Sequence, residues 1–175
     1  PGFIDGRSHF PQGGEEVLST VLLSPPPTGT IACIADLQEA LRARAAVTPE
    51  GQRIDGSRYN DLALKERRHP TREELDAVST RHPIIITHIS AHLAVANSKA
   101  FEMAGVTART QPREGVLRVK DGKLTGVMEG NAQDDVKNAI PLVPVDMAEC
   151  VAYDSNEYAA NGVTTANNGG SPTID

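Results

Sequence analysis

The sequence predicts a mixed fold of the α/β or α+β class, for three reasons. Short aliphatic runs bounded by proline or glycine, such as residues 83–88, indicate strands. Other stretches, above all residues 34–47, carry aliphatic side chains at helical spacing. The two kinds of segment alternate along 175 residues, which suffice for one ordinary domain or for one large and one small lobe.

The first third of the chain is expected to combine strands with one helix. Strands are predicted over residues 3–5, 19–23 and 52–57. Between the first two of them, Gly13 and Gly14 are expected to break the chain. The helix over residues 34–47 follows a run of prolines, and Thr30 is its candidate N-cap.

The middle of the chain carries two helix signals around a buried strand. Thr71 and Glu74 have the spacing of a capping box, which predicts a short helix. The apolar run at residues 83–88 predicts a buried strand. Residues 91–103 are predicted to form a second helix, which ends at Gly105.

A hairpin and a final helix–strand pair are predicted towards the end of the chain. Two β-type runs, residues 115–119 and 124–128, flank an Asp-Gly dipeptide, which favours a tight hairpin turn. Residues 146–160 then predict a helix, and residues 163–166 predict a strand.

Composition is that of a soluble globular protein, with 39% hydrophobic and 23% charged residues. The net charge of −6 and the lack of a basic stripe argue against nucleic acid as a partner. No apolar run approaches the ~20 residues of a membrane span, and no secretory signal is visible, so we expect no membrane partner and a cytoplasmic protein. Cys33 and Cys150 form no CxxC motif; free thiols are the default interpretation, and a disulfide stays open.

The first ten residues, PGFIDGRSHF, raise a question about metal binding. Metal hydrolases often end a strand with His-x-His, whereas this chain reads Arg7-Ser8-His9. Zinc takes three or four ligands, so His9 alone makes a poor site. Arg7 cannot be a ligand because its guanidinium has no free lone pair, but it could bind a carboxylate or phosphate through two hydrogen bonds.

Histidines are predicted in two settings, exposed turns and a strand end. His69 and His82 each precede a proline, so an exposed turn without function is the favoured interpretation. His88 and His92 have the spacing of zinc-binding helices, but they straddle a strand end, and Ile89 stands where that motif needs glutamate. Both could line a cleft at the carboxyl end of the strand, or serve as structural caps.

Tyr59, Asp61 and Glu129 also follow predicted strands. Each could be a polar group in a cleft at the sheet edge, with a plain structural role as the favoured alternative. Glu129 could equally be an acid at a helix start, where the helix dipole favours negative charge. No nucleophile elbow, P-loop or dinucleotide-binding fingerprint occurs in the sequence.

Several stretches together resemble the amidohydrolase superfamily, in particular its amidohydrolase-3 branch of YtcJ-like metal-dependent hydrolases. PGFIDGRSHF is similar to the first barrel strand of that superfamily, which usually reads Pro-Gly-Phe-Ile-Asp-x-His-x-His. Residues 59–106 are similar to a long segment typical of the branch, and residues 115–132 and 157–170 follow in the expected order. The chain is therefore identified as a member of this branch over almost its whole length.

The resemblance implies a partial (β/α)8 barrel, because a complete barrel takes ~250 residues. Residues 1–13 would be its first strand with a degenerate His-x-His motif. Residues 14–135 would be a large inserted α/β domain, and residues 136–175 a barrel helix and the second strand. The family's later histidines and its catalytic aspartate would lie downstream, so we expect an N-terminal fragment of a longer protein.

The resemblance also implies chemistry and site residues. Family members use a divalent metal, zinc first among them, to hydrolyse amide or cyclic amide C–N bonds of small molecules. His9 would be a metal ligand, and no catalytic residue is assigned within this chain. The side chains expected to shape a substrate site are those of His88, His92, Tyr59, Asn97, Glu129 and Arg7.

Three positions depart from the family pattern. Arg7 replaces the first metal-binding histidine, and the loss of that ligand should remove most activity even in a full-length parent. The chain itself is expected to be inert because it lacks most of the metal ligands, and to hold no metal if Arg7 breaks the site. Ala91 replaces the glycine of the family's Ser-Gly-His, and Arg58 stands where a glycine is usual.

Two other interpretations stay open. Arg7 and the cleft histidines could make the chain a non-catalytic module that binds a small anion. Alternatively, the chain could be a structural lobe that forms homo-oligomers, since strands cut from a barrel leave unpaired edges and bare apolar faces.

Overall fold

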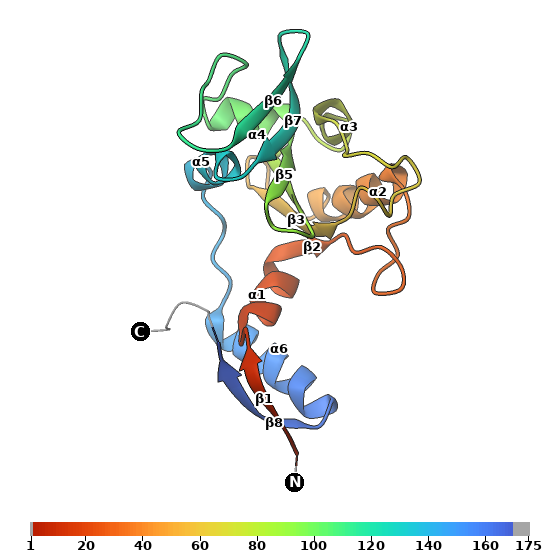
Figure 1. Cartoon of the computed structure of the whole chain (residues 1–175), viewed down its shortest axis with the longest axis vertical. Helices are drawn as coiled ribbons and strands as arrows, with labels where there is room; N and C mark the ends of the chain where they lie inside the picture. Colours follow the sequence, from red (N-terminus) through yellow and green to blue (C-terminus); the bar gives the residue numbers. More distant parts are fainter. Residues whose placement is uncertain (1, 170–175) are drawn as a thin grey trace. The chain divides into compact units, whose positions relative to one another are not determined.

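The computed structural model describes residues 2–169, and these form two compact units (Figure 1). The smaller unit joins the segment up to Ser19 to the segment from Pro144 onward, and the larger unit spans Thr20–Val143. Pro1 and Gly170, which belong to two of the motifs quoted above, lie outside the described residues.

The smaller unit pairs two parallel strands with two helices. Its strands are β1 (Phe3–Ser8) and β8 (Val163–Asn168), which are distant in sequence and hydrogen-bonded to each other. Its helices are α1 (Gln12–Ser19) and α6 (Met147–Ala160). The two predicted strands and the final predicted helix are confirmed, whereas α1 was not predicted.

Gly13 and Gly14 were expected to break the chain, and that prediction was wrong, because both lie inside α1. A Cβ on Gly14 would lie 2.3 Å from the carbonyl oxygen of Cys150 in α6, closer than any side chain tolerates. The two helices pack this closely only because the position carries no side chain. Glycine serves helix packing here, and local propensity cannot reveal a tertiary contact.

The larger unit is built on one mixed sheet, in the order β2-β3-β4-β5-β7-β6 (Figure 1). The strands β2, β3 and β4 pair in parallel, and each later pair in that order is antiparallel. Its strands are β2 (Thr20–Leu22), β3 (Ile54–Tyr59), β4 (Ile84–His88), β5 (Leu93–Ala96), β6 (Val116–Lys120) and β7 (Lys123–Glu129). Its helices are α2 (Ile34–Ala45), α3 (Arg72–Asp76), α4 (Ser98–Met103) and α5 (Ala132–Ala139). The described residues form a mixed α/β fold, as predicted, and their sheets do not close into a barrel.

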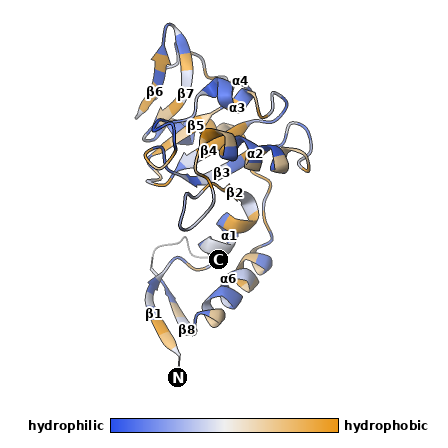
Figure 2. Cartoon of the chain, turned by 90° about the vertical axis from the view of Figure 1, so that its right-hand side faces the viewer, coloured by the Kyte–Doolittle hydropathy of each residue, from blue (hydrophilic) through white to orange (hydrophobic). Residues whose placement is uncertain are grey.

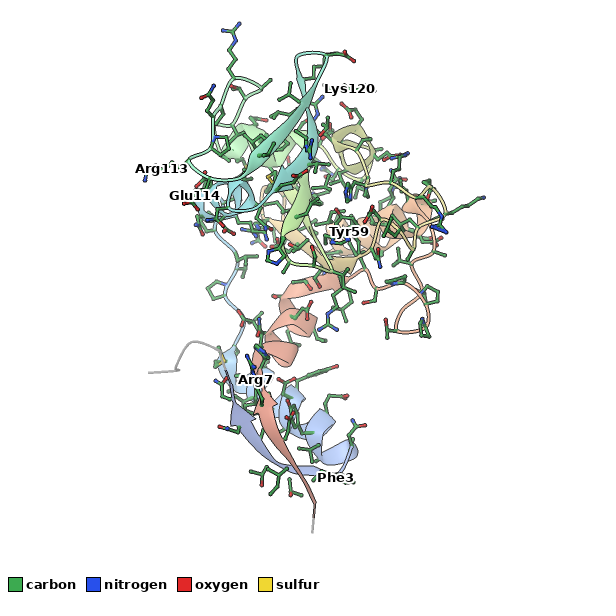
Figure 3. The ribbon with its side chains drawn as sticks, in the orientation of Figure 1. Phe3, Arg7, Tyr59, Arg113, Glu114 and Lys120 are labelled. Carbon is green, nitrogen blue, oxygen red and sulfur yellow. The ribbon has the colours of Figure 1, made fainter. Side chains whose placement is uncertain are left out.

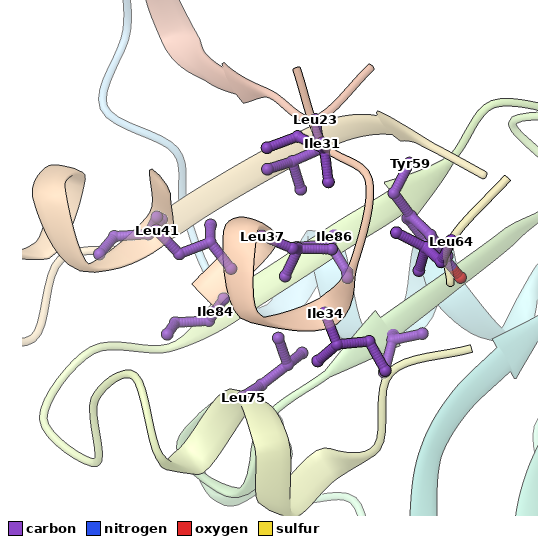
Figure 4. Packing of buried hydrophobic residues seen from close by; sticks show 12 residues of the cluster. Leu23, Ile31, Ile34, Leu37, Leu41, Tyr59, Leu64, Leu75, Ile84 and Ile86 are labelled. Carbon is purple, nitrogen blue, oxygen red and sulfur yellow. The ribbon is translucent and has the colours of Figure 1, made fainter. Parts of the chain in front are cut away.

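Apolar clusters cover both faces of this sheet. On β4, Ile84 and Ile86 belong to one cluster and Ile85 to the other, because successive side chains of a strand point to opposite faces. The first cluster packs against α2 (Figure 4). The second includes Phe101 of α4 and Val136 of α5. Burial on both faces explains the unbroken apolar run of β4, whose colouring stands out in Figure 2. The predicted buried strand is confirmed.

The capping-box and hairpin signals both predicted their elements correctly. Thr71 Oγ1 accepts the N–H of Glu74 at 3.2 Å, and Glu74 Oε2 accepts the N–H of Thr71 at 2.8 Å, at the start of α3. β6 and β7 form the hairpin, and its turn residues Asp121 and Gly122 have φ of 50° and 74°, as the tight turn requires.

The helix predicted over residues 91–103 was wrong in its first half. Leu93–Ala96 form β5, which pairs antiparallel with β4, and only Ser98–Met103 are helical. A short apolar run fits the period of a buried strand and that of a helix equally well. Two smaller errors accompany it: Cys33 rather than Thr30 holds the N-cap of α2, and α5 was not predicted.

Among residues 2–169, no helix has the length and hydrophobicity that crossing a membrane requires.

Candidate functional site

Four residues singled out from the sequence lie along one edge of the larger sheet. Tyr59 ends β3 and His88 ends β4, and the two are register partners. Glu129 ends β7 opposite Leu93, the first residue of β5, and His92 precedes Leu93 in the chain. We call this edge, at the carboxyl ends of β3, β4 and β7, the carboxyl edge. It is the edge at which sheets of α/β proteins bind ligands.

Tyr59 and His88 form a polar cluster with Asp61 and His69, which we call the edge cluster. Tyr59 Oη lies 3.2 Å from Nδ1 of His69. Asp61 Oδ1 lies 3.1 Å from Nε2 of His88 and 3.9 Å from Nδ1 of His69. The rings of Tyr59, His69 and His88 meet edge to face in every pair, with centroids 6.1, 5.2 and 6.0 Å apart. Tyr59 lies well inside the larger unit (Figure 3).

Hydrogen bonds around His88 determine where its proton lies. The backbone N–H of Ser90 donates to Nδ1 of His88 at 3.1 Å, so the neutral ring carries its proton on Nε2, towards Asp61. The buried Nε2 has no partner with hydrogen-bond geometry, although Asp61 Oδ1 is 3.1 Å away. The contact is therefore an electrostatic one between an N–H and a carboxylate rather than an aligned hydrogen bond.

Burial changes the ionisation of two members of the edge cluster. Burial, reinforced by the negative charge of Asp61, raises the pKa of Tyr59, so the phenol keeps its proton beside Nδ1 of His69. Burial lowers the pKa of His69 against the opposing charge of Asp61, and His88 adds to the lowering. The cluster thus places a protonated phenol and a neutral imidazole beside a carboxylate.

The two histidines that were expected in exposed turns are both packed, so that prediction was wrong. The side chain of His69 is 31% exposed, within the edge cluster. His82 is only 3% exposed, with its ring bonded to Ser79 Oγ and to the carbonyl of Thr48 at 2.8 and 3.0 Å. A His-Pro dipeptide shows that the chain turns, but it does not show what packs over the turn.

His92 and Glu129 lie at the carboxyl edge but outside the edge cluster. His92 is exposed, and its carbonyl accepts the N–H of Gly130 at 2.9 Å. Glu129 Oε1 accepts a hydrogen bond from Nε of Arg118 at 2.6 Å, across the hairpin.

Asn97 lies at the opposite end of β4 and β5, and its amide is fully engaged. Its Oδ1 accepts the N–H of Ile84 at 3.0 Å and that of Ala100 at 2.9 Å, which caps α4. Its Nδ2 donates to the carbonyls of Ser79 and His82 at 3.0 and 2.9 Å. With 0% of its surface exposed, Asn97 holds the chain together at this point and is not near the other candidates.

Arg7 and His9 belong to the smaller unit. Arg7 lies exposed near the end of β1 (Figure 3), and His9 is exposed just after the strand. Among residues 2–169, no three His, Cys, Asp or Glu side chains are placed so that they could hold a metal ion together. Arg7 cannot supply a missing ligand. The described residues do not fit a metal by themselves, so no catalytic step through one follows from them.

The larger unit is a mixed α/β fold with polar side chains at its carboxyl edge. The family model described as "Amidohydrolase family" matches residues 1–174. This chain belongs to the amidohydrolase family, as the resemblance of its motifs implied.

Named relatives are longer proteins. The chain is 32% identical over 130 residues to an N-substituted formamide deformylase from Arthrobacter pascens, covering 73% of this chain and 23% of that protein. It is 28% identical over 145 residues to the amidohydrolase YtcJ from Bacillus subtilis (strain 168), covering 82% and 26%. The chain therefore spans about a quarter of the length of these relatives.

A solved structure shares the fold. An uncharacterized metal-dependent hydrolase from Pyrococcus horikoshii OT3 superposes with a TM-score of 0.61 at 22% identity, covering 95% of this chain and 30% of that one. At this identity the likeness concerns the fold alone.

Proposed function

We propose that this chain is the front segment of a hydrolase that cleaves C–N bonds of small molecules, N-substituted formamides and related amides among them. The observation that carries the proposal is the family match over residues 1–174, together with the similarity to a formamide deformylase. In the proposed architecture, β1 and β8 are the first two strands of a (β/α)8 barrel, which agrees with their parallel pairing. The insertion between them then corresponds to the unit Thr20–Val143.

The carboxyl edge is, in this proposal, the part of the larger unit that contacts substrate. An amide offers a carbonyl acceptor and, in most cases, an N–H donor. Asp61 can accept a hydrogen bond, and a neutral imidazole such as that of His69 can donate one. The partly exposed rings of His69 and His88 add apolar surface. A neutral polar small molecule fits these groups better than an anion does, because Asp61 would repel the anion.

A divalent metal, zinc first among the candidates, would serve the complete enzyme by activating water. His9 would be one of its ligands, and the others would come from outside this chain. Arg7 stands where the family pattern has another histidine, and its positive charge disfavours a cation nearby. The chain alone is therefore inert towards amides in this proposal.

The test is an assay of the purified chain with added zinc against N-substituted formamides, simple amides and hydantoins. We expect no turnover above that of zinc in buffer. Metal-dependent turnover by the chain alone would overturn the proposed inertness. Weak binding of a formamide is measured in parallel by NMR, where we expect shifts at His69 and His88 that His88→Gln abolishes.

A second candidate function is the binding of a small anion, and the exposed Arg7 favours it. The variant Arg7→His, in a longer protein that carries this sequence, distinguishes the two. A gain of hydrolysis indicates an enzyme with one damaged ligand position. Loss of phosphate binding without any gain of hydrolysis indicates the anion-binding module.

Self-association is the third role considered, and the apolar surface of β1 favours it. Phe3, labelled in Figure 3, and Ile4 are each 74% exposed. We propose that the isolated chain forms homo-oligomers through such surface, as unpaired strands often do. A monomer in sedimentation experiments at micromolar concentration would contradict this.

A further inference from the structure

We propose that Ser90 is a nucleophile activated by His88 and Asp61, independently of any metal. Ser90 Oγ lies 2.8 Å from Nδ1 of His88, and Nε2 of the same ring lies 3.1 Å from Oδ1 of Asp61. A hydroxyl, an imidazole and a carboxylate in this order of contact activate serine in acyl-transfer enzymes, although here the two ring nitrogens have exchanged roles, with serine at Nδ1 and the carboxylate at Nε2.

The proton positions suit this role. Because the backbone N–H of Ser90 donates to Nδ1 of His88 at 3.1 Å, that nitrogen carries the lone pair. The Ser90 hydroxyl, 2.8 Å away, shares this lone pair with the N–H, and its proton can move to Nδ1 as the bond to the N–H lengthens. The proton on Nε2 then faces Asp61, whose negative charge stabilises the imidazolium that forms. The contact is not yet an aligned hydrogen bond, as is common in catalytic groups without substrate.

The burial of these groups also suits an activated serine. Ser90 is exposed and open to a reagent, whereas the side chains of His88 and Asp61 are only 16% and 19% exposed. Ile89 and Leu62, the chain neighbours of Ser90 and Asp61, are 54% and 68% exposed, and they offer apolar surface to an acyl or aryl group. Activated aryl esters are therefore the substrate class that fits.

The reaction that follows is acyl transfer. Ser90 Oγ attacks the ester carbonyl, its proton moves to Nδ1 of His88, and the bond to the aryl oxygen breaks as that proton passes to the leaving aryloxide. Water then hydrolyses the acyl-serine.

The amide N–H groups of residues 89–92 are all engaged, with Tyr59 O, His88 Nδ1, His88 O and Ser90 Oγ respectively. None of these four stabilises an oxyanion, so turnover is slow, and ordinary amides are not attacked.

The test is labelling of the whole chain by an alkyl fluorophosphonate in the presence of EDTA, read by peptide mass spectrometry. A bond forms between Oγ and phosphorus as fluoride leaves. We expect modification of Ser90 at least tenfold faster than of Ser98, the internal control, whose Oγ contacts the Asp76 carboxylate at 2.6 Å. Ser90→Ala abolishes the label, and Asp61→Asn slows it about tenfold or more. Labelling of Ser90 no faster than Ser98 overturns the proposal.

A pH profile of the labelling rate needs only the wild-type chain, so it tests the proposal even if the variants fail to fold. The labelling rate of Ser90 is expected to rise with pH and level off as one group loses its proton, because the free base form of His88 is required. A rate that rises in proportion to hydroxide, without levelling, contradicts activation by His88. Since EDTA is present throughout, failure here leaves the proposed amidohydrolase role untouched.

Discussion

Arg58 and Ala91 share an uncommon backbone conformation at the carboxyl edge, with φ of 66° and 61°. Arg58 lies directly before Tyr59, where the pairing of β3 with β4 is irregular, and Ala91 lies in the turn after His88. Left-handed φ costs an L-residue roughly 1–2 kcal/mol, which glycine avoids. The resemblance to the amidohydrolase family implies glycine at both positions, and the left-handed φ gives a physical reason for that preference. Two strained positions therefore flank the edge cluster, as strain often flanks functional sites.

Ala91→Gly is expected to raise the free energy of unfolding by about 1 kcal/mol, because the strain removed exceeds the entropy that glycine adds to the unfolded chain. Urea unfolding measures the change. Ala77→Gly is the matched control: Ala77 is also exposed but has a right-handed φ of −67°, so glycine should destabilise there. Equal losses at both positions would rule out strain at Ala91.

Arg53 and Asp55 form a buried ion pair, with side chains 5% and 8% exposed and Nη2 2.8 Å from Oδ1. Nη1 of Arg53 also donates to the carbonyls of Lys137 and Ile140 at 2.7 and 2.9 Å, at the end of α5. Arg53→Met leaves the buried carboxylate of Asp55 without a positively charged partner. We therefore expect the free energy of unfolding to fall by about 3 kcal/mol or more.

The control for that variant is Arg81→Met, since Arg81 pairs with Glu50 at 3.4 Å on the exposed surface. An exposed pair contributes little, so its loss should be under about 1 kcal/mol. If the two substitutions destabilise equally in urea, the buried pair does not hold α5 as the structure indicates.

Stability is expected to fall in mildly acidic solution through His69. Burial lowers its pKa below the ordinary 6.5, so the unfolded chain binds the proton more readily than the folded chain does. This contribution is fully present above pH 6.5 and is lost as pH falls towards the lowered value. Wild type should therefore lose more stability between pH 7 and pH 5.5 than His69→Gln does, as urea unfolding at both pH values would show. His92→Gln controls for removal of an imidazole at the same edge, and equal losses in wild type and His69→Gln would contradict the prediction.

Asn97→Ala is expected to destabilise the chain by about 3 kcal/mol or more. The substitution removes the cap of α4 and leaves two buried N–H groups and two carbonyls without their partner. Thermal or urea unfolding measures the loss, and Asn138→Ala, on the exposed side of α5, is the control. A folded variant of wild-type stability that no longer binds a formamide would instead restore Asn97 as a substrate contact.

The sequence predicted correctly those elements that depend only on interactions between neighbouring residues. The Thr71–Glu74 capping box and the Asp121-Gly122 turn need only neighbouring residues, and both are found where the sequence placed them. Gly14 was misread because its cause lies in Cys150, more than a hundred residues away. The segment around Leu93 was misread because strand and helix bury a short apolar run equally well.

The sequence predicted only part of the candidate site, because only some of its contacts follow from where the strands end. Tyr59 and His88 were named because each ends a strand, and parallel pairing brings the two together. His69 was dismissed, since its approach to Tyr59 depends on how the loop between them folds back. Asn97 was named from its motif, and its hydrogen bonds give it a purely structural task.

Metal content is the measurement that tests the account most directly. The purified chain is dialysed against trace zinc and analysed by elemental mass spectrometry. We expect no stoichiometric metal, because Arg7 stands where the resemblance implies a histidine ligand and no three suitable side chains among residues 2–169 converge on an ion. Metal bound at close to one ion per chain would contradict it, because His9 would then have found partners that this account does not recognise.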